Sequence, residues 1–124
     1  MEPSKGTTPR RARARLQRHT PGEMNSTEKR FLSEVIAPRM AAGEIHAWWF
    51  ESMTLKIAER TRYTPDFLIQ LPDGTLECWE VKGGFWQDDA RVKIKVTAQR
   101  FPFPLVAWMP KAKRDGGGWS REEF

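Results

Sequence analysis

The sequence predicts one α/β (α+β) domain, with a central mixed β-sheet flanked by two helices and the element order α-β-β-β-β-α-β. A length of 124 residues suits a single domain with one modest core. Capping residues open two helical stretches, and short aromatic or β-branched runs between and after them predict strands. We expect the domain over residues 24–110, between a basic arm at 1–23 and a polar, Gly-rich tail at 111–124.

Composition restricts the function classes. The chain is 39% hydrophobic and 30% charged, which fits a small folded domain with at least one disordered end. A net charge of +5 favours a polyanionic partner, although charge alone is a weak indicator. Cys78 is the single cysteine, so an intrachain disulfide is excluded and a cysteine-based zinc site is disfavoured. We expect no membrane span and no signal peptide, and a reducing, cytoplasmic location.

The first helix is expected to begin after Asn25, with Glu28 closing a capping box. Its apolar stripe at helical spacing consists of Phe31, Leu32, Val35 and Ile36. Glu28 falls on the same face as this stripe, so it is either a cap, a site residue or both. Pro38 should kink or end the helix, and Gly43 should close the segment.

Ile45–Phe50 and Thr54–Glu59 are predicted to be short strands. His46 stands alone, which favours a structural or surface role over metal binding. Residues 66–71 and 75–82 form the next two strands, joined by Pro72-Asp73-Gly74. A second helix is expected from Asp88 or Asp89 to about Arg100, and residues 105–109 form a short buried strand.

The register of this central hairpin decides which side chains meet. A three-residue loop, with Gly74 in the left-handed region, pairs Asp66 with Glu80. A two- or four-residue loop would instead pair Asp66 with Val81 and direct Glu80 to the opposite face. We expect the first arrangement, with Phe67 and Trp79 on the other face of the sheet.

Asp66, Glu80 and Lys82 are residue types that suit phosphodiester chemistry. Hard divalent cations bind carboxylate oxygens together with water and phosphate. Lys82 lies two residues from Glu80 on one strand, so both side chains are expected on one face. A lysine beside two carboxylates stays protonated, which suits charge stabilisation or water positioning better than proton abstraction. Each of these short patterns is also common in ordinary strands, so the combination carries the prediction.

Pro65-Asp66 followed by Glu80-Val81-Lys82 resembles the signature of the PD-(D/E)XK nuclease superfamily, with its restriction-endonuclease-like core. The expected element order is similar to that core, with one strand extra. The resemblance extends to small phage-encoded members of the Holliday-junction-resolvase kind. It implies that Asp66 and Glu80, with the Val81 carbonyl, bind Mg²⁺ or Mn²⁺, while Lys82 positions the attacking water.

The resemblance also implies roles for residues outside the hairpin. Glu28 matches the further acidic residue that many members carry on the first helix. The basic run in the second helix resembles a motif of the family, with Lys95 slightly favoured over Lys93 as the functional lysine. The basic residues of this helix could equally form a solvated face. Expected nucleic-acid contacts comprise Arg10, Arg11, Arg13, Arg15 and Arg18 in the arm and Arg91, Lys93 and Lys95 in the helix.

Three hypotheses compete at this point. The leading one is a metal-dependent DNA endonuclease, phage-encoded and acting in the cytoplasm of a bacterial host, with selectivity for junctions or other branched DNA left open. The second is a non-catalytic nucleic-acid-binding or accessory protein on the same fold. The third is a small structural or virion-associated protein in which the motif arises by chance. Separately, the basic arm could be a solubilising or vestigial terminus. Cutting both strands of a duplex would favour a homodimer.

Overall fold

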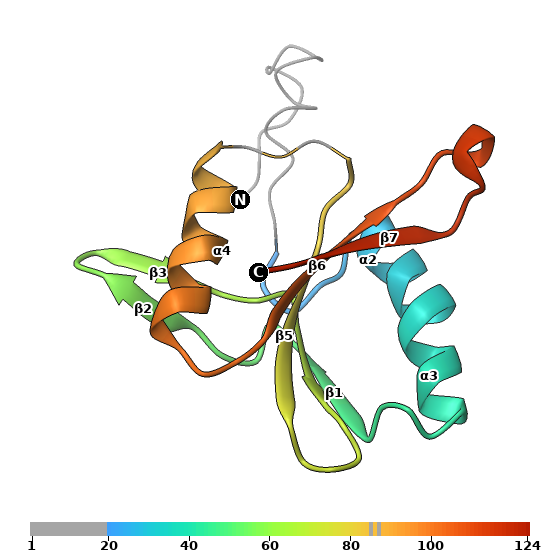
Figure 1. Ribbon diagram of the computed structural model, residues 1–124, viewed down its shortest axis with the longest axis horizontal. Coiled ribbons are helices and arrows are strands. Elements are labelled where there is room, and N and C mark those ends of the chain that lie inside the picture. Colours follow the sequence, from blue (N-terminus) through green and yellow to red (C-terminus); the bar gives the residue numbers. More distant parts are fainter. Residues whose placement is uncertain (1–19, 85, 87) are drawn as a thin grey trace.

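The computed structural model describes residues 20–84, 86 and 88–124. Its centre is a five-stranded sheet in the spatial order β1-β4-β5-β6-β7 (Figure 1). Within it β5 and β6 run parallel, while the other neighbouring strands are antiparallel. The strands of this sheet are β1 (Ala47–Phe50), β4 (Phe67–Gln70), β5 (Leu76–Val81), β6 (Leu105–Pro110) and β7 (Trp119–Glu123). A mixed sheet with helices is therefore confirmed.

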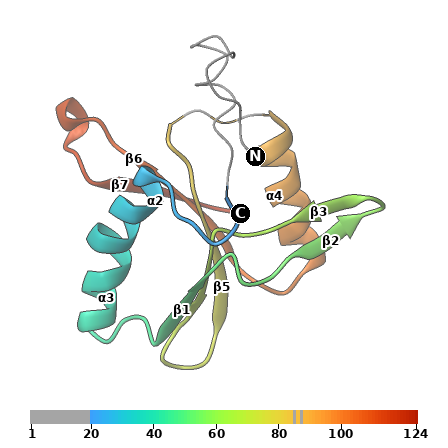
Figure 2. The ribbon, with the colours of Figure 1, turned by 180° about the vertical axis from the view of Figure 1, so that it is seen from behind.

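Helices cover both faces of the sheet, as the two opposite views show (Figures 1 and 2). The segment from α2 (Ser26–Phe31) to α3 (Ala37–Ala41) packs on one face, where Phe31 contacts the rings of Phe67, Trp79 and Trp108. On the other face, α4 (Asp88–Arg100) contributes Ile94 to a second apolar cluster. Cys78 lies in that cluster and has no exposed surface. Alternate residues of β5 therefore supply two different cores.

The first helical segment begins as the sequence predicts and then departs from it. Asn25 and Glu28 form the capping box that opens α2 (Ser26–Phe31). The chain then widens into a π-helical turn at Leu32–Ile36 and continues as α3 (Ala37–Ala41). The Ala37 amide bonds to the Leu32 carbonyl, five residues back, just before Pro38, which has no amide proton to donate. Pro38 therefore sits in the first turn of α3, and the helical path continues beyond it.

The β4–β5 hairpin has the predicted register. Phe67 pairs with Trp79 and Gln70 pairs with Leu76, so Pro72-Asp73-Gly74 forms a three-residue loop. The Leu71 amide donates to the Thr75 carbonyl at 2.8 Å, which closes the loop. Gly74 has φ +92°, a left-handed conformation that side chains of other residues disfavour. Phe67 and Trp79 both pack in the core beneath α2, as expected for one shared face.

Two strands lie where the sequence did not predict them. The expected strand at Thr54–Glu59 exists as β2 (Leu55–Ala58), but it pairs with an unpredicted β3 (Thr61–Tyr63) in a separate sheet. The predicted polar tail at 111–124 is wrong over its last part, because Trp119–Glu123 forms β7 and pairs with β6. The short 3₁₀ turn Lys113–Asp115 joins these strands. No helix in the described residues is long and apolar enough to cross a membrane.

Candidate active site at the open end of the β4–β5 hairpin

Asp66 and Glu80 come together at the open end of the hairpin. Asp66 directly precedes β4, and Glu80 is the residue of β5 that follows Trp79, the partner of Phe67. Continuing this register by one step places Asp66 opposite Glu80. The Val81 amide donates to Asp66 Oδ2 at 2.8 Å, so the aspartate carboxylate reaches across to β5. Glu80 is only 8% exposed.

Two further groups hold the Glu80 carboxylate. The Tyr63 hydroxyl donates to Glu80 Oε1 at 2.6 Å, and Lys82 Nζ lies 3.5 Å from Oε2. The same ammonium lies 5.2 Å from the centroid of the Trp86 ring. Each oxygen of the buried glutamate therefore faces a donor. The charge of Lys82 also acts on Asp66, where it lowers the pKa of that carboxyl group against the raising effect of burial.

Burial raises the pKa of both carboxyl groups. Burial is the main cause that raises the pKa of Asp66, to about 9, and the charge of Glu80 raises it further. The pKa of Glu80 is raised chiefly by burial, against the lowering effects of Tyr63 and Lys82. The pKa of Tyr63 is likewise raised by burial and by the neighbouring glutamate. A bound cation would favour the ionised form of both carboxyl groups and so lower these pKa values.

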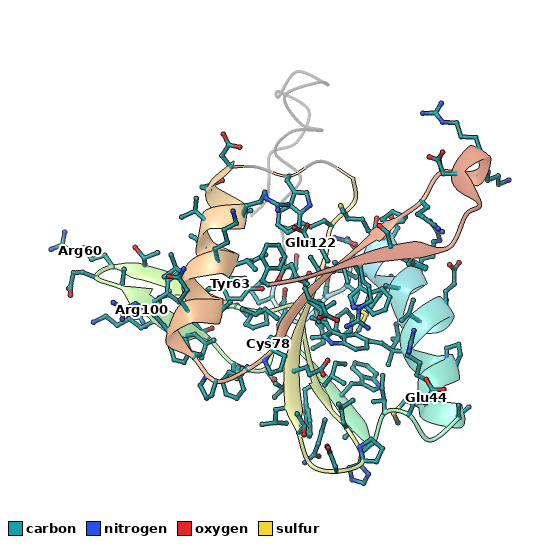
Figure 3. All side chains as sticks on the ribbon, viewed as in Figure 1. Glu44, Arg60, Tyr63, Cys78, Arg100 and Glu122 are labelled. Atoms are coloured by element: carbon teal, nitrogen blue, oxygen red, sulfur yellow. The ribbon has the colours of Figure 1, made fainter. Side chains whose placement is uncertain are left out.

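A cavity of about 290 Å³ opens beside Glu80. Figure 3 shows Tyr63 between α4 and the central sheet, in the region where this cavity lies. Three positive side chains line it: Arg62 from β3, Lys82 from the residue after β5, and Lys93 from α4. Asp89, at the start of α4, is a second acidic residue in the lining. The cavity thus combines one buried carboxylate with cations suited to phosphate oxygens.

Glu28 lies close to this site and has a structural role there. Its Oε1 accepts the Asn25 amide at 2.9 Å, which completes the capping box. The residue is 5% exposed, and its charge raises the pKa of Asp66. The capping role is confirmed, while a direct role in the chemistry stays a prediction. Among the described residues, no group of three or more His, Cys, Asp or Glu side chains is arranged to hold a metal ion.

The basic residues of α4 separate into different surroundings. Lys93 lines the cavity, whereas Lys95 is exposed and acts electrostatically on Glu122. Arg91 forms a two-pronged hydrogen-bonded pair with Glu122, at 3.2 and 2.7 Å. The preference for Lys95 over Lys93 therefore finds no geometric support. The basic arm residues expected to contact nucleic acid lie outside the described residues: Arg10, Arg11, Arg13, Arg15 and Arg18.

Sequence reasoning missed Tyr63 and Arg62 as parts of this site. Both lie on β3, which belongs to the small separate sheet, so alternation along the central hairpin does not reach them. The available signal was local: Tyr63 is the only tyrosine of the chain and lies three residues before Asp66. A buried tyrosine hydroxyl needs a polar partner, and a neighbouring carboxylate is a natural one.

The donor set fits a hard divalent cation. Mg²⁺ is commonly bound through one or two carboxylates, with water and phosphate completing its shell. Asp66 and Glu80 supply two carboxylates at the open end of one hairpin, and burial, which raises the pKa of both, gives a reason for a cation there. No family model, curated protein or solved structure matches this chain. The functional assignment therefore depends on this geometry.

Proposed function

We propose that this chain is a divalent-metal-dependent DNA endonuclease with a PD-(D/E)XK arrangement. The observation that carries the proposal is the juxtaposition of Asp66 and Glu80 on one hairpin, with Lys82 beside the glutamate. Leaving aside the β2–β3 hairpin and β7, the elements run α-β-β-β-α-β, the order of that family's core. The sequence predicted this order with one further strand, and the agreement supports the proposal.

The residues of the candidate site would have different roles in phosphodiester hydrolysis. Asp66 and Glu80 would hold Mg²⁺ or Mn²⁺, and the ion would supply charge neutralisation and activation of water. Lys82 holds a positive charge beside Glu80, where it can stabilise charge that develops on the phosphoryl oxygens or orient a water. Lys93 lies across the cavity from β5 and can hold a neighbouring phosphate of the DNA backbone.

Nicking of supercoiled plasmid in Mn²⁺ and in Mg²⁺ tests this function, with branched and linear DNA compared as substrates. We expect Asp66→Asn and Glu80→Gln to abolish nicking while the protein stays folded. Lys82→Ala should slow it by about 100- to 1,000-fold, the order found when one charge-stabilising donor is removed. Glu77→Gln is the matched control, since Glu77 is on the same strand and bonds to the Trp79 ring nitrogen.

The outcomes separate the competing functions. Cleavage by Asp66→Asn at the parent rate would remove the assignment of this site. Tight DNA binding by the parent without cleavage in either metal would favour a nucleic-acid-binding or accessory protein instead. Direct calorimetric titration with Mn²⁺ provides a readout besides activity, because Asp66→Asn should lose the binding heat that the parent gives.

A further inference from the structure

The β2–β3 hairpin stands apart from the central sheet. Both ribbon views show it beside α4 and projecting outward from the body of the protein (Figures 1 and 2). Its inner face is apolar: Ile57 and Tyr63 are buried in the cluster that includes Ile94 of α4. This packing fixes the hairpin against the helix, so its outer face has a defined position relative to the cavity.

The outer face of this hairpin concentrates positive charge. Lys56 and Arg62 are direct cross-strand partners, and both are exposed. Like charges in that position destabilise a strand pair, so folding does not favour them. Lys56 makes one long ion pair with exposed Glu59, at 3.8 Å, and Arg62 makes none among the described residues. Arg60 stands at the outer tip of the hairpin (Figure 3).

These charges are continuous with the candidate active site. Arg62 lines the same cavity as Glu80, Lys82 and Lys93. The hydroxyl group of the next residue, Tyr63, donates a hydrogen bond to Glu80. A DNA strand with one phosphate beside Glu80 would therefore pass Arg62 in the cavity lining and then Lys56, the cross-strand partner of Arg62. A partner with closely spaced negative charges would offset the repulsion between these two cations. The phosphates of a nucleic-acid backbone provide such charges.

We infer that the outer face of the β2–β3 hairpin, formed by Lys56 and Arg62, contacts the phosphate backbone of the DNA substrate beside the cleavage site. The inference rests on the proposed function for the identity of the partner. It adds a second contact surface to the cavity, on an element outside the central sheet. Such contacts position the duplex but read no sequence.

The test is the salt dependence of binding to a linear duplex, measured between about 50 and 200 mM salt. All proteins carry Asp66→Asn, so that the DNA is not cut. Removing both charges, with Lys56→Gln and Arg62→Gln together, should reduce the slope of log K against log salt by about 1.8, or roughly 0.9 for each phosphate that the protein no longer neutralises. The charge-conserving pair Lys56→Arg and Arg62→Lys should keep the parent slope.

A matched control removes two charges elsewhere. Lys111 and Lys113 are exposed in the β6–β7 connection, at the opposite side of the molecule from β2–β3 in both ribbon views. Lys111→Gln with Lys113→Gln changes the net charge equally and should leave the slope within error of the parent. An equal change in the two double variants would overturn the inference, because the effect would then follow net charge alone.

The inference and the proposed function fail separately. If the metal-loaded parent nicks DNA while the hairpin variant keeps the parent slope, the hairpin contact is wrong and the nuclease stands. If the slope depends on the hairpin but the parent never nicks DNA, the hairpin contact is supported and the proposed nuclease function is wrong. Absence of duplex binding by the Asp66→Asn protein at the lowest salt concentration would overturn the hairpin contact regardless of nicking. Far-UV circular dichroism checks that each variant is folded.

Discussion

The Tyr63 hydroxyl donates a 2.6 Å hydrogen bond to Glu80 Oε1 and so joins the small β2–β3 sheet to the central one. Tyr63 is 8% exposed and packs in the apolar cluster beneath α4. A hydrogen bond to a charged group is worth more than a neutral one, about 1.5–3 kcal/mol. The bond therefore fixes one oxygen of Glu80 and leaves the other toward Lys82.

Tyr63→Phe should weaken metal use without removing the fold. The ring remains to fill its site, while Glu80 loses the donor that orients it. We expect affinity for Mn²⁺ to fall by about 10- to 100-fold, the usual effect of losing a group that orients a metal ligand. Nicking rates titrated with Mn²⁺ measure this. Much of the activity should return at saturating metal, whereas a loss that saturating metal does not restore would contradict a positioning role.

Stability without metal should fall as the pH rises. The pKa of Asp66 is about 9 in the folded protein, and that of an unfolded aspartate is about 3.9. Between these values the folded state binds more protons than the unfolded state, so each unit of pH reduces the stability conferred by this group. Urea unfolding in EDTA should therefore show a lower free energy of unfolding at pH 8 than at pH 5.

Two additions to that experiment give its controls. Mn²⁺ should raise stability at pH 8 more than at pH 5, because cation binding requires ionised carboxylates. Asp66→Asn should be more stable than the parent at pH 8 in EDTA, since it does not have to take up a proton on folding as Asp66 does. Equal stability of parent and variant throughout this pH range would show that the Asp66 carboxyl group does not destabilise the metal-free protein.

Lys93 should matter more than Lys95 for DNA binding and cleavage. Lys93 lines the cavity, whereas Lys95 is exposed and its charge acts on Glu122. We expect Lys93→Ala to weaken duplex binding by roughly tenfold or more, the order expected for loss of a hydrogen bond to a charged group. Lys95→Ala changes the net charge equally and is the paired control. A larger loss with Lys95→Ala would reverse this assignment and support the sequence-based preference.

The sequence predicts the parts of this fold whose signals are local. The capping box of Asn25 and Glu28 lies within four residues, and Gly74 in Pro72-Asp73-Gly74 favours the three-residue loop that the hairpin adopts. The pairing of Asp66 with Glu80 follows from that register. These predictions succeed because the groups involved are neighbours along the chain or across one turn.

The remaining features depend on contacts that sequence spacing does not reveal. Two residues on a helix that are two positions apart point about 200° apart, so Lys93 and Lys95 cannot share a face. Which of them faces the cavity depends on how α4 packs on the sheet, through Ile94 and its neighbours. The bond from Tyr63 to Glu80 likewise depends on where the separate β2–β3 sheet packs, and the two partners are 17 positions apart in the sequence.

The last strand provides the clearest case, since β7 was expected to be part of a polar tail. Gly116-Gly117-Gly118 and the charged run after Trp119 resemble an unstructured end. However, the Trp119 ring lies 5.2 Å from the Phe31 ring, and its nitrogen donates to Glu34 Oε1 at 3.0 Å. An edge strand can be polar on its outer face, so composition alone misses it.

Trp119→Ala should therefore destabilise the protein. Complete loss of a buried tryptophan costs about 3–5 kcal/mol, and a half-buried one should lie at or below the lower end of that range. Urea unfolding at pH 6 with Trp49→Ala as control measures this, because Trp49 is 43% exposed and should cost much less. Deleting residues 111–124 should be more severe, since it also uncovers the edge of β6 and leaves Arg91 without Glu122. A deletion variant as stable as the parent would mean that β7 contributes nothing to the fold, and that the segment is the polar tail its composition suggests.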